Sequence, residues 1–166
     1  MKTIELTKGK VALVDDEDYG WLSQYNWSAS KGNSGLWYAR RGGSVNKRKY
    51  QVYMHRQIMG CEEKDKIDHV DGNGLNNQRS NLRPATHKQN VSSQKKQTRP
   101  TSSRYKGVRW RPAERKWAAA IKHNGKTIYL GLFILEASAA VAYNAAALTL
   151  FGEFARLNKI QGAQTP

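Results

Sequence analysis

A polar, basic segment divides the chain into two parts, and no single core can run through it. Residues 91–103 read VSSQKKQTRPTSS and carry no large apolar side chain. Such a stretch is typical of a linker. We therefore expect two small folding units in the 166 residues, one spanning 1–94 and one spanning 104–160, joined by a basic linker at 95–103.

Positive charge is distributed unevenly between these parts. The chain has 28 Lys and Arg against 13 Asp and Glu, a formal net charge of +15. Between Lys95 and Lys126 lie eleven of the cations and one acid, Glu114, whereas acids gather at 15–18 and 62–71. This pattern favours a polyanionic partner, above all nucleic acid. A basic surface that only aids solubility is the alternative.

Residues 1–60 alternate between apolar and polar side chains as a small sheet does. Asp15 to Asp18 could cap a helix through Tyr25, or, less readily, form a metal site. We expect Trp21, Trp27 and Trp37 in the core. The remaining predicted elements are strands at 4–6 and 11–14, a hairpin of 27–30 with 36–41 around 32–35, a strand at 50–53 and a helix end at 55–59 closed by Gly60.

The second unit has clear signals for three strands and one helix. The segments YKGVRWRP, KWAAAIKH and KTIYLGLF predict strands, and Asn124-Gly125 between the last two is a strong hairpin signal. An Ala-rich helix is predicted from about Glu136 to Phe151. Its small side chains would let it lie close on the sheet. The whole chain is thus expected to be α+β.

Residues 67–90, IDHVDGNGLNNQRSNLRPATHKQN, carry residue types suited to phosphodiester hydrolysis. That reaction needs a general base for water and a cation at the phosphate. Asp68 and His69 are adjacent and point to opposite faces of an extended strand. The turn at 71–74 would bring back a strand at 81–83, and a short helix at 86–93 would carry Asn90.

This segment resembles the HNH family of ββα-metal nucleases, in the form found in phage homing endonucleases. The matching words are DH at 68–69, DGN at 71–73, NN at 76–77, NLR at 81–83 and QN at 89–90. The resemblance implies a ββα-metal core at about 54–94, in which Asp68 and Asn90 hold Mg²⁺ or Mn²⁺. It further implies that His69 is the general base and that Asn81 braces the loop and orients His69.

The chain departs from the motif at its final histidine, which is replaced here by Asn90. An amide oxygen can still bind a hard cation. His87 lies one helical turn earlier and is expected to face another direction. His55 and His123 are expected at the surface or in contact with the backbone.

The second unit resembles the Apetala-two/ethylene-response-factor DNA-binding domain of plant transcription factors, also found attached to phage HNH nucleases. The matching words are YKGVRWRP, KWAAAIK, YLGLF, AAVAYNAAA and FARLN. The chain departs from the family at Ala113 and Ala120, so sequence preference is not transferred. DNA contacts are expected from the strands, with the linker cations along the phosphate backbone: Arg104, Lys106, Arg109, Arg111, Lys122 and Tyr129, and Lys95, Lys96 and Arg99.

Together these features predict a metal-dependent DNA endonuclease of a phage or mobile element, acting as a monomer or dimer on double-stranded DNA in a bacterial cytoplasm. The alternatives are a DNA-binding regulator with a decayed nuclease site and a packaging protein without sequence preference. Cys61 is the sole cysteine, which excludes a disulfide within the chain and a Cys-based zinc site. We expect no signal peptide, and the apolar stretch 137–151 is too short to span a membrane.

Overall fold

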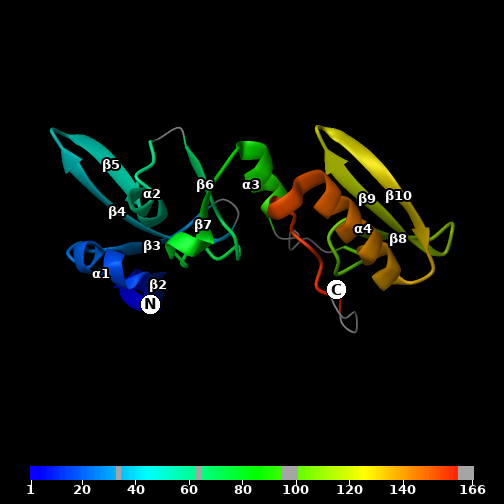
Figure 1. Ribbon diagram of the computed structural model, residues 1–166, viewed down its shortest axis with the longest axis horizontal. Coiled ribbons are helices and arrows are strands. Elements are labelled where there is room, and N and C mark those ends of the chain that lie inside the picture. The colour runs from blue at the N-terminus through cyan, green and yellow to red at the C-terminus, as the bar shows by residue number, and fades with distance from the viewer. Residues whose placement is uncertain (33–34, 63–64, 95–100, 161–166) are drawn as a thin grey trace. The chain divides into compact units, whose positions relative to one another are not determined.

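The computed structural model describes residues 1–32, 35–62, 65–94 and 101–160. The chain is α+β, as the sequence predicts, with small antiparallel sheets and few helices (Figure 1). It divides into two compact units, Met1–Asn90 and Val91–Pro166. Each unit has its own hydrophobic core, so each is described by itself.

The described residues of the first unit form three small sheets. Strands β1 (Lys2–Leu6) and β2 (Lys10–Val14) form the first, and β3 (Ser28–Lys31), β4 (Trp37–Val45) and β5 (Arg48–Tyr53) form the second. The third pairs β6 (Lys66–His69) with β7 (Leu82–Ala85). Its helices are α1 (Asp16–Leu22) and α2 (Met54–Ile58), with 3₁₀ turns η1 (Thr7–Gly9) and η2 (Arg79–Asn81), and α3 (His87–Ser93) begins in this unit and continues past its end at Asn90.

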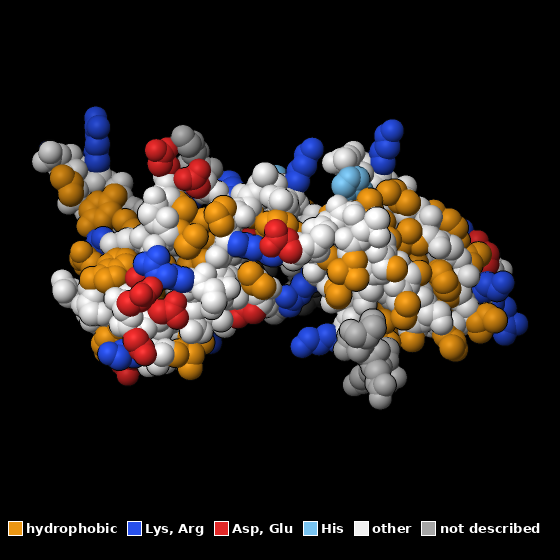
Figure 2. Space-filling model, viewed as in Figure 1, with side chains coloured by type: hydrophobic (Ala, Val, Ile, Leu, Met, Phe, Trp, Pro, Cys, Tyr) orange, Lys and Arg blue, Asp and Glu red, His pale blue; other side chains and the backbone are white. Residues whose placement is uncertain are grey.

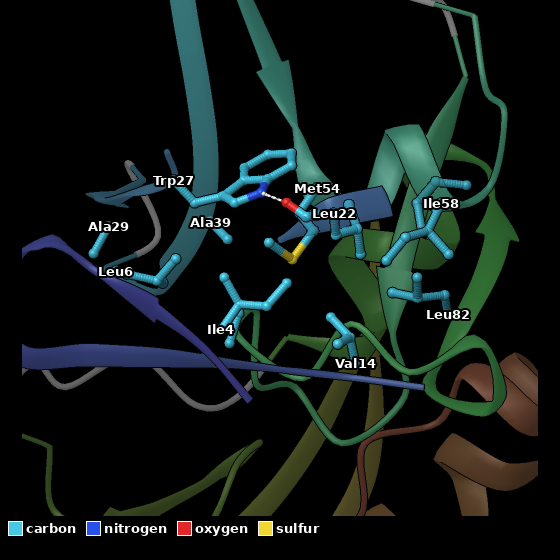
Figure 3. Close-up of a cluster of buried hydrophobic side chains, with 12 residues drawn as sticks. Ile4, Leu6, Val14, Leu22, Trp27, Ala29, Ala39, Met54, Ile58 and Leu82 are labelled. Carbon is cyan, nitrogen blue, oxygen red and sulfur yellow. Dashed lines mark hydrogen bonds between the residues drawn. The ribbon is translucent and has the colours of Figure 1, made fainter. Parts of the chain in front are cut away.

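Alternation along the first strands builds the core of this unit. Ile4 and Leu6 face inward, and the exposed Glu5 between them faces solvent. Figure 3 shows their side chains gathered with those of Met54 from α2 and Leu82 from β7. The indole of Trp27, buried as predicted, donates a 2.8 Å hydrogen bond to the carbonyl of Leu22. This shared core fixes α2 beside the β6–β7 pair.

Carboxylates of the acidic run at 15–18 bind a loop that is distant in the sequence. Helix α1 begins at Asp16, but the Asp15 carboxylate accepts hydrogen bonds from Gln78 Nε2 (3.1 Å) and from the backbone N–H of Arg79 (2.7 Å) instead of capping the helix. Asp18 is 1% exposed and accepts from Arg79 Nε and Nη2 at 2.9 and 2.8 Å. The expectation that these acids cap the helix is therefore wrong for Asp15, because a tertiary contact takes its side chain.

The second unit is a three-stranded antiparallel sheet with one long helix against it (Figure 1). Its strands are β8 (Val108–Arg111), β9 (Lys116–His123) and β10 (Lys126–Phe133), in the order β10-β9-β8. Helix α4 (Glu136–Phe151) has the predicted bounds and is followed by a 3₁₀ turn, η3 (Gly152–Phe154). The predicted strands and hairpin are all present.

Small residues let α4 pack closely on the sheet. Ala119 of β9 and Ala140 and Ala147 of α4 are fully buried, and so is most of Tyr143. The outer face of α4 is also apolar, with Val141 and Leu148 about half exposed, and Figure 2 shows hydrophobic side chains across the surface of this unit. No helix among the described residues is long and apolar enough to cross a membrane.

Candidate functional site

The β6–β7 pair places the two residues of the DH word. Asp68 lies opposite Arg83 and His69 opposite Leu82, and both Asp68 and His69 are buried, at 5% and 6% exposed. Arg83 Nε and Nη2 donate to one carboxylate oxygen of Asp68 at 3.1 and 2.8 Å. These two hydrogen bonds hold the buried Asp68 carboxylate in a fixed orientation. Sequence reasoning did not single out Arg83 for this contact.

Asn81 braces the loop between the two strands. Its Oδ1 accepts from the backbone N–H of Asp71 at 3.0 Å, and its Nδ2 donates to Asp71 Oδ1 (3.1 Å) and to the carbonyl of Asn76 (2.8 Å). Burial alone would raise the pKa of Asp71, but hydrogen bonds from Asn76, Asn73 and Asn81 outweigh it and hold that pKa below its ordinary value. The DGN and NN words thus belong to one hydrogen-bonded loop.

This loop is also pinned to the neighbouring sheets, which the simple turn of the sequence prediction does not include. The backbone N–H of Leu13 donates to the carbonyl of Leu75, and that of Asn77 donates to the carbonyl of Leu13, both at 2.8 Å. A Cβ added at Gly74 would meet the carbonyl of Trp37 at 2.4 Å and the ring of Tyr38 at 2.6 Å. The loop therefore lies directly against β2 and β4.

Asn90 faces the start of the same strand as Asp68. Thr86 and Gln89 form a reciprocal capping box, since Thr86 N–H donates to Gln89 Oε1 (2.7 Å) and Gln89 N–H donates to Thr86 Oγ1 (3.2 Å). This cap starts α3 and sets Asn90, whose Nδ2 donates to the carbonyl of Ile67 at 3.5 Å. The Asn90 amide and the Asp68 carboxylate consequently flank one short stretch of β6.

The donors at this stretch suit a hard divalent cation. One carboxylate and one amide oxygen are ligand types that Mg²⁺ and Mn²⁺ accept, with phosphate and water oxygens completing the shell. The described residues contain no group of three or more His, Cys, Asp and Glu side chains that could hold a metal ion by themselves.

His69 lies at the same site, and its imidazole is neutral. Burial lowers its pKa below the ordinary value of 6.5, although Asn77, Asp71 and Asp68 oppose that shift. Its Nε2 atom is buried and has no hydrogen-bond partner among the described residues. A neutral ring carries a lone pair that can accept a proton from water.

His55 lies beside it and is buried, so of the two expected positions, at the surface or in contact with the backbone, the surface position is wrong. His55 is 9% exposed at the start of α2, and its ring centroid is 5.0 Å from that of His69, at an interplanar angle of 77°. Burial, followed by electrostatic repulsion from the protonated form of His69 and from Arg56, lowers the pKa of His55 to about 3. No sequence pattern indicates the burial of His55, because a five-residue helix shows no periodicity and the contact with His69 joins residues 14 positions apart.

The other histidines lie elsewhere. His87 is exposed on α3, whereas Asn90 on the same helix is half-buried, in keeping with the expectation that His87 faces another direction. His123 is half-buried on β9 with its ring 5.7 Å from that of Phe151.

Comparison with known proteins identifies the family. No protein-family model matches the chain. An uncharacterized HNH endonuclease of Acanthamoeba polyphaga mimivirus is 36% identical to it over 159 residues, which cover 92% of this chain and 77% of the relative. The chain belongs to the HNH endonuclease family. Since the first unit ends at Asn90, an alignment of that length also includes much of the second unit of this HNH protein.

The second unit of this HNH family member presents polar side chains on the sheet face opposite α4. In the register of the sheet Arg109 pairs with Ala118, Tyr129 with Ala120 and Lys122 with Thr127, so the members of each pair share a face. Arg109, Lys122 and Tyr129 are exposed. Arg111 is bound to Glu114 by a 2.8 Å ion pair, which a phosphate or base would have to displace.

Arg104 and Lys106 lie at a basic pocket beside this sheet. The pocket has a volume of about 250 Å³, and Arg156 and Lys159 also line it. Lys106 is half-buried and its Nζ donates to the carbonyls of Ser92 (2.9 Å) and Gln94 (2.8 Å). Burial, followed by the charge of Arg156, lowers the pKa of Lys106 to about 8. The remaining predicted DNA contacts, Lys95, Lys96 and Arg99, lie outside the described residues.

Proposed function

We propose that this HNH family member is a DNA endonuclease that hydrolyses phosphodiester bonds at the β6–β7–α3 site with one divalent metal ion. The observation that carries the proposal is the neutral, buried imidazole of His69 next to the Asp68 carboxylate, on one strand of a protein of this family. A base and a metal ligand on neighbouring residues are what hydrolysis of a phosphodiester requires.

In this proposal the side chains of the site divide the work. His69 accepts the proton of the attacking water, and Asn81 keeps the loop that follows His69 in shape through its bonds to Asp71 and Asn76. Arg83 holds the Asp68 carboxylate in place. Asp68 and Asn90 would hold Mg²⁺ or Mn²⁺, and the ion, when bound, supplies positive charge to the scissile phosphate and the leaving oxygen.

In this proposal the second unit binds double-stranded DNA. Arg109, Lys122 and Tyr129 share one exposed face of a three-stranded sheet, and a sheet of this kind can enter a major groove. The motif words shared with the Apetala-two/ethylene-response-factor domain support the same assignment. The basic pocket at Arg104 and Lys106 adds positive charge for the phosphate backbone. A viral or mobile-element setting, in a bacterial cytoplasm for a phage, is part of the proposal.

The metal assignment is tested with Asp68→Ala and Asn90→Ala, and with Glu5→Ala as control because Glu5 is an exposed carboxylate on β1. Nicking of supercoiled plasmid and binding of Mn²⁺, followed by electron paramagnetic resonance with and without a DNA oligonucleotide, are measured for each. Both site variants should bind Mn²⁺ more weakly and nick more slowly, and chelator should abolish nicking. Full nicking in chelator contradicts the hydrolytic scheme, and DNA binding without nicking under any metal supports the decayed-site regulator instead.

A further inference from the structure

Two rings from separate elements contact the imidazole of His69, and the ring of Tyr53 packs against both of them. The ring centroid of His55, from α2, is 5.0 Å away, and that of Tyr38, from β4, is 5.9 Å away. Tyr38 and His55 also contact each other, at 5.8 Å, and Tyr53 closes the group at 5.6 Å from His55. The side chain proposed as the base is thus held inside a cluster of rings.

A catalytic imidazole is usually oriented by a hydrogen bond to the nitrogen that does not react. Here Nε2 of His69 and Nδ1 of His55 are both buried, and neither has a hydrogen-bond partner among the described residues. A side-chain hydrogen bond with Asn77 helps to orient the His69 ring, and the contacts with the neighbouring rings add to that orientation. The contact between His55 and His69 is edge-to-face, an arrangement that favours a defined geometry.

His55 is itself held rigidly enough to act as a support. Its neighbour Met54 is fully buried, and Ile58, one turn further along α2, is 5% exposed, both in the core shared with β1, β2 and β7. Figure 3 shows both side chains pointing into that core. Because α2 is anchored in the core, the His55 ring is held in a fixed position against His69.

We infer that His55 is a positioning residue, whose ring packs edge-on against the His69 imidazole and fixes its orientation for proton transfer. The inference rests on the proposed function for its catalytic consequence, but the positioning itself can be measured without cleavage. A planar ring of similar size should serve in place of His55, whereas a methyl group should not. His55→Phe and His55→Ala separate these cases.

The first measurement is the order of the His69 ring, from ¹³C relaxation of the full chain with labelled histidine. The chain has four histidines, so the resonances can be assigned by substitution. The parent and His55→Phe should show a rigid His69 ring, and His55→Ala a mobile one. Ile58→Ala is the matched control, because it removes core packing from the same helix without removing a ring from the cluster. A His69 ring that stays rigid in His55→Ala overturns the inference.

The second measurement is plasmid cleavage by the same variants. His55→Ala should lower kcat by about 10–100-fold, with KM little changed, because the base is misplaced and not removed. His55→Phe should recover most of that loss. The double variant His55→Ala/His69→Ala should be no slower than His69→Ala alone, since His55 acts through His69. Additive losses overturn the inference, whereas a parent that does not cleave contradicts the proposed function and leaves ring order to decide the positioning.

Discussion

Burying the His55 imidazole makes the stability of the first unit depend on pH. The folded protein keeps the pKa of His55 at about 3, far below the 6.5 of an exposed histidine. Between these values the unfolded chain binds a proton that the folded chain does not, so stability is full above pH 6.5 and is lost as the pH falls toward 3. The lowered pKa of His69 acts in the same direction.

We therefore predict that the free energy of unfolding falls between pH 6.5 and pH 4, with His55 contributing up to about 1.4 kcal/mol for each pH unit. His55→Phe should fall less steeply than the parent in urea titrations at pH 7, 6, 5 and 4. His87→Phe, which replaces an exposed histidine, should keep the parental slope. Equal slopes for the parent and His55→Phe would show that His55 takes up its proton in the folded state.

Individual site residues differ in how far the sequence could predict their surroundings. His69 and Asn81 lie near the two ends of one loop, and the sequence spacing between them sets that arrangement locally. The burial of His55 on helix α2 depends on contacts with Tyr38 of β4 and His69 of β6. No pattern near residue 55 encodes those partners, so the expectation of a surface position was wrong.

The elements that the sequence predicted best are those with local signals. Helix α4 is long and rich in alanine, and the turn at Asn124-Gly125 has positive φ at both residues, as a type I′ hairpin turn requires. The acidic run at 15–18 predicted the start of α1, but the Asp15 side chain does not cap the helix. Its carboxylate accepts hydrogen bonds from Gln78 and Arg79 instead. Tertiary contacts overrode the local preference there.

The approach of α4 to its sheet makes Gly107 intolerant of a side chain. Gly107 has a φ of +76°, and a Cβ there would lie 2.1 Å from the ring of Tyr143 and 2.6 Å from the carbonyl of Ala120. Gly125 has a similar φ of +79° but nothing within 4 Å of its Cβ position. The two glycines therefore separate backbone strain from crowding.

Gly125→Ala should destabilise the second unit by about 1–2 kcal/mol through its positive φ alone. Gly107→Ala should add overpacking of about 1–3 kcal/mol to a similar strain. Hydrogen exchange at the Ala120 amide, which donates to the Gly107 carbonyl at 2.9 Å, reports the difference. Equal protection of that amide in the two variants would mean that α4 does not press on this turn.

At the scale of the whole molecule, positive charge should dominate the binding of DNA. The net charge of +15 predicts that log K for the full chain falls linearly with log salt, by about 0.9 for each phosphate neutralised. Arg109→Ala, if Arg109 contacts a base edge, should weaken binding to a mapped target by about 1–3 kcal/mol and blur its sequence preference. Lys2→Ala, on β1 of the first unit, is the control. Binding that is insensitive to salt and to Arg109 would exclude the sheet face as the DNA reader.

The central claim is that His69 accepts a proton during metal-dependent cleavage of DNA. The most direct test is the single-turnover rate of plasmid nicking in Mg²⁺ for the parent and His69→Ala, with DNA affinity measured in parallel. The account predicts a rate lower by a factor on the order of 10²–10⁴ in the variant, with affinity unchanged because the second unit is intact. A variant that nicks DNA as fast as the parent would contradict the account.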